Sequence, residues 1–174
     1  SGESSAHDAR LRSCYLPFMR IGIDFGGTKI EAAALDASGA FAARIRQPNP
    51  GTYNAALDLV ADLIARVEAE IGPAQSLGLA IPGSPSPRTG LIRNANSTYL
   101  NDRPLADDLE AALGRPVRLA NDANCLALSE AADGAGAGAA SLFGVILGTG
   151  CGGGLVIDGK LVEGAHGAVS YTHL

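Results

Sequence analysis

A carboxylate at the junction of a strand and a helix is the first residue of this chain that could do chemistry. The segment RLANDANCLALSE, residues 118–130, changes from a strand-like run ending at Ala120 to a helix-like run starting at Ala123. Asp122 lies at the start of that helix, where aspartate commonly accepts hydrogen bonds from unpaired backbone N–H groups. Two interpretations are therefore open for Asp122: a helix N-cap, or a general base that accepts a proton during a reaction.

A glycine-rich turn near the start of the chain is suited to bind phosphate. The segment GIDFGGTK, residues 22–29, nearly has the spacing of a phosphate-binding loop, but Thr28 precedes Lys29 instead of following it. A strand-like run follows, so we expect a hairpin turn whose backbone N–H groups and Thr28 hydroxyl face a phosphate. Asp24, at the end of the preceding strand, is suited to hold a hydrated Mg²⁺ through water. The alternative is a tight hairpin with a solvated aspartate.

Residues 148–153, Gly-Thr-Gly-Cys-Gly-Gly, form a second glycine-rich turn that matches G-x-G-x-x-G. A dinucleotide-binding fold needs a helix after these glycines, whereas residues 155–162 read as a hairpin, so we exclude that fold. Two glycine turns remain, each between strands and each able to bring backbone amides close to phosphate oxygens. The pair predicts a nucleotide held in a cleft.

Composition restricts the class of protein. The 174 residues carry a net charge of −5 without a basic cluster, so we expect neither nucleic acid nor a membrane surface as a partner. The three cysteines are far apart and lack a C-x-x-C pair, which predicts neither a disulfide framework nor a zinc site in this chain. This cysteine usage fits a reducing cytoplasm, where we expect the protein to be located. No apolar run approaches the roughly 20 residues of a membrane span, and residues 1–18 lack a signal-peptide pattern, so we also expect a soluble protein.

The elements that must position these residues predict an α/β fold with a mixed sheet. The first strands form an antiparallel meander, and the later strands and helices alternate. Residues 133–140, almost all Gly and Ala, read as a loop that leads to a second unit. We expect strands at residues 20–25, 30–36, 41–47, 76–81, 117–120, 141–147 and 154–158, and helices at 53–71, 104–113 and 123–132.

Three motifs together resemble the ROK family of sugar kinases: DFGGTK at 24–29, NDANC at 121–125 and GTGCGG at 148–153. The resemblance runs from Met19 to about Ala168, and residues 94–98, NANST, are similar to the bacterial fructokinase (mannofructokinase) branch. The family implies the actin-like, ribonuclease H-like ATPase fold, of which this chain holds the N-terminal domain and the start of the second. It also implies ATP- and Mg²⁺-dependent phosphorylation of a hexose, foremost of fructose to fructose 6-phosphate.

The resemblance also implies roles for individual residues. Asp122 is the general base, and Asn96, Asn121 and Asp122 bind the sugar. The Mg²⁺ that the family uses has its candidate site at Asp24, which would hold the ion through water. The residues implied to bind the ATP phosphates are Gly26, Gly27, Thr28, Lys29, Gly148, Thr149, Gly150 and Gly152. We expect a homodimer for a full-length protein, with sugar and ATP as its small-molecule partners.

Other functions within and beyond the family are open at this point. The sugar could be N-acetylglucosamine, glucose or mannose, or the protein could be a ROK sugar-binding regulator without catalysis. Against the regulator, the unpatterned residues 1–18 do not predict a helix-turn-helix domain. An actin-like structural ATPase would share the phosphate turns but would not need the Asn-rich loop at 94–101.

The two ends of the chain depart from the family pattern. We expect residues 1–18 to be a non-native or disordered extension, 19–133 the N-terminal kinase domain, and 134–168 the start of an incomplete C-terminal domain. Residues 169–174, VSYTHL, resemble a translated sequencing adapter, so we expect an artefactual tail. The family's remaining sugar ligands and its zinc loop lie beyond Ala168. Zn²⁺ is therefore expected only in that missing part, and this fragment alone is expected to be inactive.

Overall fold

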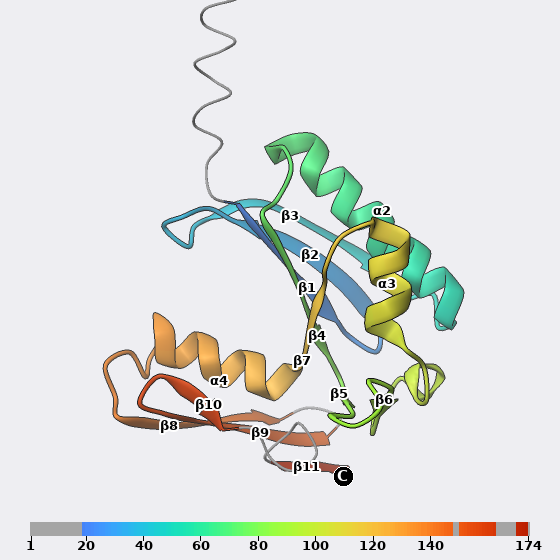
Figure 1. Cartoon of the computed structure of the whole chain (residues 1–174). Coiled ribbons are helices and arrows are strands. Elements are labelled where there is room, and N and C mark those ends of the chain that lie inside the picture. The colour runs from blue at the N-terminus through green and yellow to red at the C-terminus, as the bar shows by residue number, and fades with distance from the viewer. Residues whose placement is uncertain (1–18, 148–149, 163–169, 174) are drawn as a thin grey trace, which may run out of the picture.

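The computed structural model describes residues 19–147, 150–162 and 170–173 (Figure 1). Its larger sheet has five strands in the order β3-β2-β1-β4-β7. The first three pair antiparallel as a meander, and β4 and β7 continue the sheet in parallel with β1. The predicted mixed sheet is confirmed. The bounds of its strands are β1 (Arg20–Phe25), β2 (Lys29–Leu35), β3 (Phe41–Pro48), β4 (Ser76–Ile81) and β7 (Arg118–Asn121).

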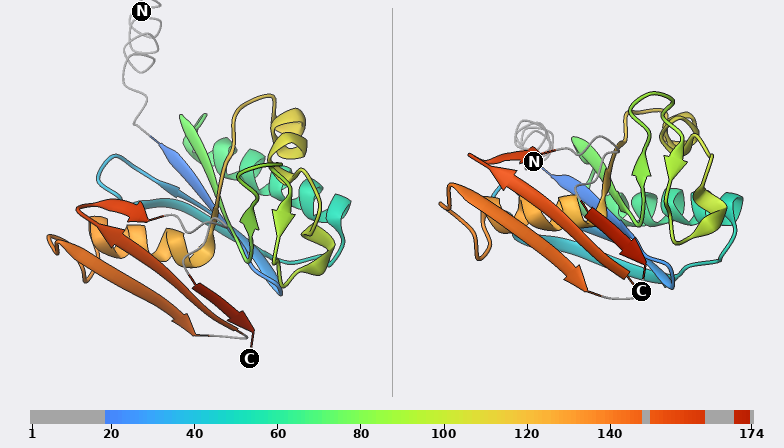
Figure 2. Two further views of the ribbon diagram at one scale, coloured as in Figure 1. Left: turned by 60° about the horizontal axis from the view of Figure 1, so that its bottom comes forward. Right: turned by 90° about the horizontal axis from the view of Figure 1, so that it is seen from below.

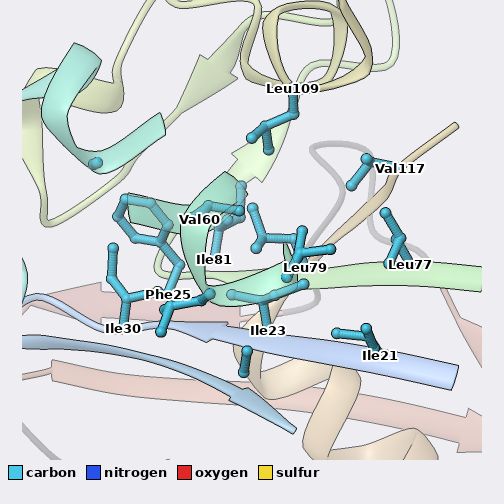
Figure 3. Packing of buried hydrophobic residues seen from close by; sticks show 14 of the residues in the cluster. Ile21, Ile23, Phe25, Ile30, Val60, Leu77, Leu79, Ile81, Leu109 and Val117 are labelled. Carbon is cyan, nitrogen blue, oxygen red and sulfur yellow. The ribbon is translucent and has the colours of Figure 1, made fainter. Parts of the chain in front are cut away.

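Helices α2 (Tyr53–Ile71) and α3 (Leu105–Leu113) cover one face of this sheet (Figure 1). Alternate residues of the strands point toward them, because successive side chains of a strand face opposite sides. The buried residues between sheet and helices include Ile21, Ile23, Phe25, Val60, Leu79 and Leu109 (Figure 3). No helix in the described ranges is long and apolar enough to cross a membrane.

The segment between β4 and α3, predicted to be a loop, contains three short elements. They are β5 (Ser84–Pro85), β6 (Ile92–Arg93) and the 3₁₀ turn η1 (Thr98–Leu100). β5 and β6 pair antiparallel. Elements of two or three residues leave no periodic pattern in a sequence, so these could not be predicted.

A second, smaller sheet is built around β9 (Gly150–Ile157), with β8 (Ser141–Leu147) on one side. β10 (Lys160–Val162) and β11 (Ser170–His173) pair with the other side. The strand predicted at 154–158 thus begins four residues earlier, and much of the predicted second glycine turn belongs to a strand. Glycine disfavours strands, which hid this element in the sequence.

Helix α4 (Asp122–Ala132) follows β7 in the chain but packs against β8 and β9 of the smaller sheet (Figure 2). The approach is close. A Cβ atom added to Gly154 would lie 2.5 Å from the Ala123 carbonyl oxygen, and one added to Gly144 would lie 3.1 Å from the Ala127 Cβ. A side chain at Gly154 would therefore clash with α4, and one at Gly144 would require the helix to give by a few tenths of an ångström.

The opposite face of the smaller sheet carries exposed apolar side chains. Phe143 is 55% exposed, Val145 47% and Leu147 78%, and they alternate along β8 with residues that are partly buried. The alternation agrees with one face packed on α4 and the other facing solvent in the described part of the chain.

Glu31 on β2 is a buried carboxylate held by two arginines of β3. Its side-chain oxygens accept hydrogen bonds from Nε of Arg44 and Nε of Arg46. Burial would raise the pKa of Glu31, but the two hydrogen bonds outweigh it and hold the pKa below its ordinary value of 4.5. Because the pKa is lowered in the folded state, these interactions stabilise the fold above that pH and are lost as the pH falls further.

We therefore expect Glu31→Gln to lower the melting temperature near neutral pH. The difference from wild type should shrink as the pH falls from about 4.5 through the lowered pKa of the folded protein, because the carboxyl is first protonated in the unfolded chain and then in the folded one. Thermal unfolding followed by circular dichroism at several pH values measures this. A deficit of the same size at all pH values would show that the charge of Glu31 does not contribute.

Candidate active site

The parallel strands β1, β4 and β7 place three functional segments at the same edge of the larger sheet. Asp24 on β1 lies beside Ala80 on β4, which in turn lies beside Ala120 on β7. The carboxyl ends of these strands lead into the first glycine turn, the Pro82-Gly83 loop, and Asp122. Ligands of open α/β sheets commonly bind at this edge.

The first glycine turn, residues 26–28, is tight and accessible. A Cβ atom on Gly26 would lie 2.8 Å from the Lys29 carbonyl oxygen, so only glycine fits there. Gly27, Thr28 and Lys29 are exposed. The predicted hairpin between β1 and β2 is confirmed, and phosphate binding by its residues stays a prediction.

Asp24 lies directly opposite Glu31 across the β1–β2 ladder. Partial burial raises the pKa of the Asp24 carboxyl, and the charge of Glu31 raises it further. Lys29 and Arg46 act in the opposite direction. Among the described residues there is no cluster of three or more His, Cys, Asp or Glu side chains that could hold a metal ion by themselves. A hydrated Mg²⁺ needs only one or two carboxylates together with substrate phosphates, so Asp24 fits that ion.

The helix N-cap, one of the two interpretations open for Asp122, is formed by the preceding residue instead. The Asn121 Oδ1 accepts from the backbone N–H of Ala123 at 3.1 Å and of Asn124 at 3.4 Å. Its Nδ2 donates to the Gly83 carbonyl oxygen at 3.0 Å. β7 runs one residue further than predicted, which makes the extended Asn121 the cap and Asp122 the first helical residue. Sugar binding by Asn121 stays a prediction beside this structural role.

Asp122 is partly buried at the N-terminus of α4, and its Oδ1 accepts from the Ala123 N–H at 2.8 Å. Burial raises the pKa of Asp122 and the hydrogen bond from Ala123 lowers it, while the charge of Asp24 raises it again; the net pKa is above the ordinary value. Burial and both carboxylates also raise the pKa of Cys125 to about 11. The thiol is thus protonated at neutral pH, and Asp24 and Asp122 act on the same region.

Asn96, predicted to bind the sugar, and Asp24 line two different hollows. This hollow has a volume of about 710 Å³ and is lined by Ile92, Arg93, Asn94, Ala95, Asn96, Thr98, Asn101 and Asp102. A separate hollow of about 450 Å³ is lined by residues that include Asp24 and Cys125. Asn96 and Asp24 thus line two different hollows in the described part of the chain, and these two hollows share no lining residue.

Gly83 contacts both the Asn-rich loop at residues 94–101, here called the Asn96 loop, and the start of α4. A Cβ atom on Gly83 would lie 2.9 Å from the Ala95 Cα, so the two segments touch through their backbones. The Asn96 N–H donates to the Pro82 carbonyl oxygen at 3.0 Å. Since Gly83 also accepts from Asn121, the Asn96 loop and the cap of α4 are held by the same short segment.

The second glycine-rich turn, predicted to bind phosphate, lies partly outside the described residues. Gly148 and Thr149 lie outside the described residues, and Gly150 begins β9. Gly152 is a buried strand residue paired with Ile146.

Two further residues near the first glycine turn were not predicted from the sequence. They are Asn49 and Tyr99, whose side chains hydrogen-bond to each other. No sequence signal pointed to them, because they are 50 positions apart.

The mixed sheet, its glycine hairpin and the strand-end carboxylates define a chain of the actin-like ATPase class. The protein belongs to the ROK family, whose model matches residues 20–172. The resemblance of the three motifs to this family is thus confirmed.

Solved structures of ROK kinases share this fold. A ROK family glucokinase from Streptomyces griseus, in complex with glucose and AMPPNP, matches with a TM-score of 0.80 and 31% identity, over 87% of this chain and 48% of that one. A ROK hexokinase from Thermus thermophilus matches with a TM-score of 0.74 and 35% identity, over 86% of this chain and 49% of that one.

A curated relative with higher identity is an N-acetyl-D-glucosamine kinase. That protein, from Salmonella paratyphi C (strain RKS4594), is 45% identical over 147 residues, which are 84% of this chain and 48% of the relative. The chain thus spans about half the length of the curated relatives it matches.

Proposed function

We propose that the protein carrying this chain is an ATP-dependent hexose kinase in which Asp122 is the general base. The observation that supports this most is the position of Asp122. Its partly buried carboxylate follows β7, at the sheet edge where β1 leads into the exposed glycine turn, in a chain whose relatives are sugar kinases.

The reaction needs positioning, charge neutralisation and one proton acceptor. A hexose hydroxyl oxygen forms a bond to the γ-phosphorus of ATP while the bond between that phosphorus and the ADP oxygen breaks. The Asp122 carboxylate accepts the hydroxyl proton, and its raised pKa makes it a better base near neutral pH. Mg²⁺, held by Asp24 through water, would neutralise phosphate charge when bound, and the turn at 26–28 would donate backbone N–H groups to the phosphates.

Two sugars are candidates for the substrate. Fructose is favoured by the similarity of residues 94–98 to the fructokinase branch, and by that segment alone. N-acetylglucosamine is favoured by the 45% identity to kinases of that sugar. A coupled assay of ADP release from a full-length protein that carries this chain, with fructose, mannose, glucose and N-acetylglucosamine, separates them. Absence of ADP release with every hexose would overturn the kinase proposal.

We also propose that the chain holds parts of two domains. The expected boundary lies between residues 133 and 134, but the packing of α4 on β8 and β9 favours a boundary between Asn121 and Asp122. The proposal has three further parts. Residues 1–18 are a non-native or disordered extension, and residues 169–174 are an artefactual tail. The full-length protein is a cytoplasmic homodimer, and this chain by itself is inactive.

Replacing Asn96 should affect the KM for sugar more than the KM for ATP. In the full-length enzyme we expect Asn96→Ala to raise the KM for sugar by about fivefold to tenfold, because a sugar hydroxyl loses its hydrogen-bond partner. The KM for ATP should change much less. Steady-state kinetics with each substrate varied in turn measures the two constants.

The control is Asn54→Ala, which makes the same change at an exposed position of α2. It should leave both constants as in wild type. An equal rise of both KM values in Asn96→Ala would remove Asn96 from the sugar site.

A further inference from the structure

Asn49, just after β3, holds the first glycine turn from both ends. Its side-chain Nδ2 donates to the Gly26 carbonyl oxygen at 2.7 Å. Its backbone N–H donates to the Thr28 carbonyl oxygen at 2.9 Å. These two hydrogen bonds link the position of the turn at 26–28 to that of Asn49.

The other side of the same amide contacts the Asn96 loop. The Asn49 Oδ1 accepts from the Gly51 N–H at 3.0 Å and from the Tyr99 hydroxyl at 2.8 Å. The backbone partners fix the amide orientation, because the Gly26 carbonyl needs a donor and the Gly51 N–H needs an acceptor. The Tyr99 hydroxyl must therefore be the donor in this hydrogen bond, and a side chain that can only accept could not take its place.

Tyr99 is firmly part of the Asn96 loop. It lies in η1, where the Leu100 N–H donates to the Ser97 carbonyl oxygen at 2.9 Å. Asn101 brackets Ala95, accepting from its N–H at 2.9 Å and donating to its carbonyl at 3.2 Å. The two loops also lie side by side, since a Cβ atom on Gly27 would be 4.0 Å from the Ser97 Oγ.

We propose that Asn49 and Tyr99 are positioning residues that couple nucleotide binding to sugar binding. Sugar on the Asn96 loop fixes Tyr99, which through Asn49 fixes the turn for the phosphates; by thermodynamic linkage, nucleotide on the turn tightens sugar binding by the same factor. This inference rests on the proposed hexose kinase function. It adds a connection between the two substrates that neither loop provides alone.

The variant that tests this bridge is Tyr99→Phe, which removes the hydroxyl and keeps the ring. In the full-length enzyme, the Kd of Mg-AMPPNP is measured by calorimetry with and without each candidate hexose at saturation. We expect the factor by which the hexose tightens Mg-AMPPNP binding to fall by about 2-fold to 10-fold, the usual range for one hydrogen bond. Asn49→Asp should reduce it further, because a carboxylate cannot donate to the Gly26 carbonyl.

The matched control is Tyr53→Phe. The Tyr53 hydroxyl donates to Asp108 at 2.6 Å, a contact between α2 and α3 that touches neither loop. Its coupling factor should equal that of wild type. An unchanged factor in Tyr99→Phe, or an equal loss in Tyr53→Phe, would overturn the proposal.

Hydrogen exchange gives a second readout that does not depend on activity. In the ligand-free 174-residue chain and in the full-length enzyme, Tyr99→Phe should speed exchange of amides 26–29 about 2-fold to 10-fold relative to Tyr53→Phe. Equal exchange in the two variants would overturn the bridge. A wild-type protein that phosphorylates no hexose would overturn the proposed function instead, and exchange would still decide whether the bridge exists.

Discussion

Asp122→Asn in the full-length enzyme is expected to lower kcat by about 10²–10⁴, while MgATP still binds with nearly wild-type affinity. Asparagine keeps an oxygen that can accept from the Ala123 N–H, so the start of α4 is preserved. It cannot accept the proton of the attacking hydroxyl at neutral pH. The substitution thus separates chemistry from helix capping, which Asn121 performs.

A matched control is Asp107→Asn. Asp107 is an exposed aspartate in the first turn of α3, as Asp122 is in the first turn of α4. It should leave kcat unchanged. Single-turnover phosphorylation and calorimetric MgATP binding are the measurements, and turnover of Asp122→Asn within a few-fold of wild type would show that another group accepts the proton.

Gly154→Ala should destabilise the protein by about 1–3 kcal/mol, the cost of overpacking a tight contact. Its new methyl group would lie 2.5 Å from the Ala123 carbonyl oxygen and 2.8 Å from the Ala127 Cβ, so α4 must move away from β9. Ala123 follows the proposed base directly, and kcat should therefore fall as well. Chemical denaturation and steady-state kinetics measure the two effects.

The neighbouring Gly153→Ala is the control for this prediction. Its methyl group would meet the end of the Phe143 ring at 2.6 Å, on the other face of the sheet. Phe143 is 55% exposed, so its ring can turn away at low cost. Equal destabilisation by both substitutions would mean that the glycine run needs its backbone freedom rather than space for α4.

Regular elements with a clear period were predictable from the sequence. The helix at residues 53–71 and the strands at 20–25, 76–81 and 141–147 have the predicted bounds. In α2 the apolar residues recur at helical spacing, and the structure buries Ala56, Val60, Leu63, Ile64 and Val67 among them. The glycine hairpin was predictable too, because the run after Lys29 reads as a strand.

Features that depend on contacts distant in the chain were not predictable. The strand character of Gly150 to Gly154 comes from pairing with β8 and from the nearness of α4, which override low strand propensity. The N-cap of α4 is Asn121 and not Asp122, because β7 pairs with β4 up to Asn121 and the helix begins one residue later. Asn49 reads as an ordinary turn residue, and its partners Gly26 and Tyr99 are known only once the fold brings them together.

Helix α4 joins the two sheets at the residue proposed as the base. Its first turn is bonded to Asn121, whose side chain donates to the Gly83 carbonyl beside the larger sheet, while the helix packs on β8 and β9 of the smaller sheet. The contact with the smaller sheet begins already at Ala123, the residue after Asp122. A rotation of one sheet against the other would therefore shift the Asp122 carboxylate, so the relative orientation of the two sheets sets the position of the proposed proton acceptor.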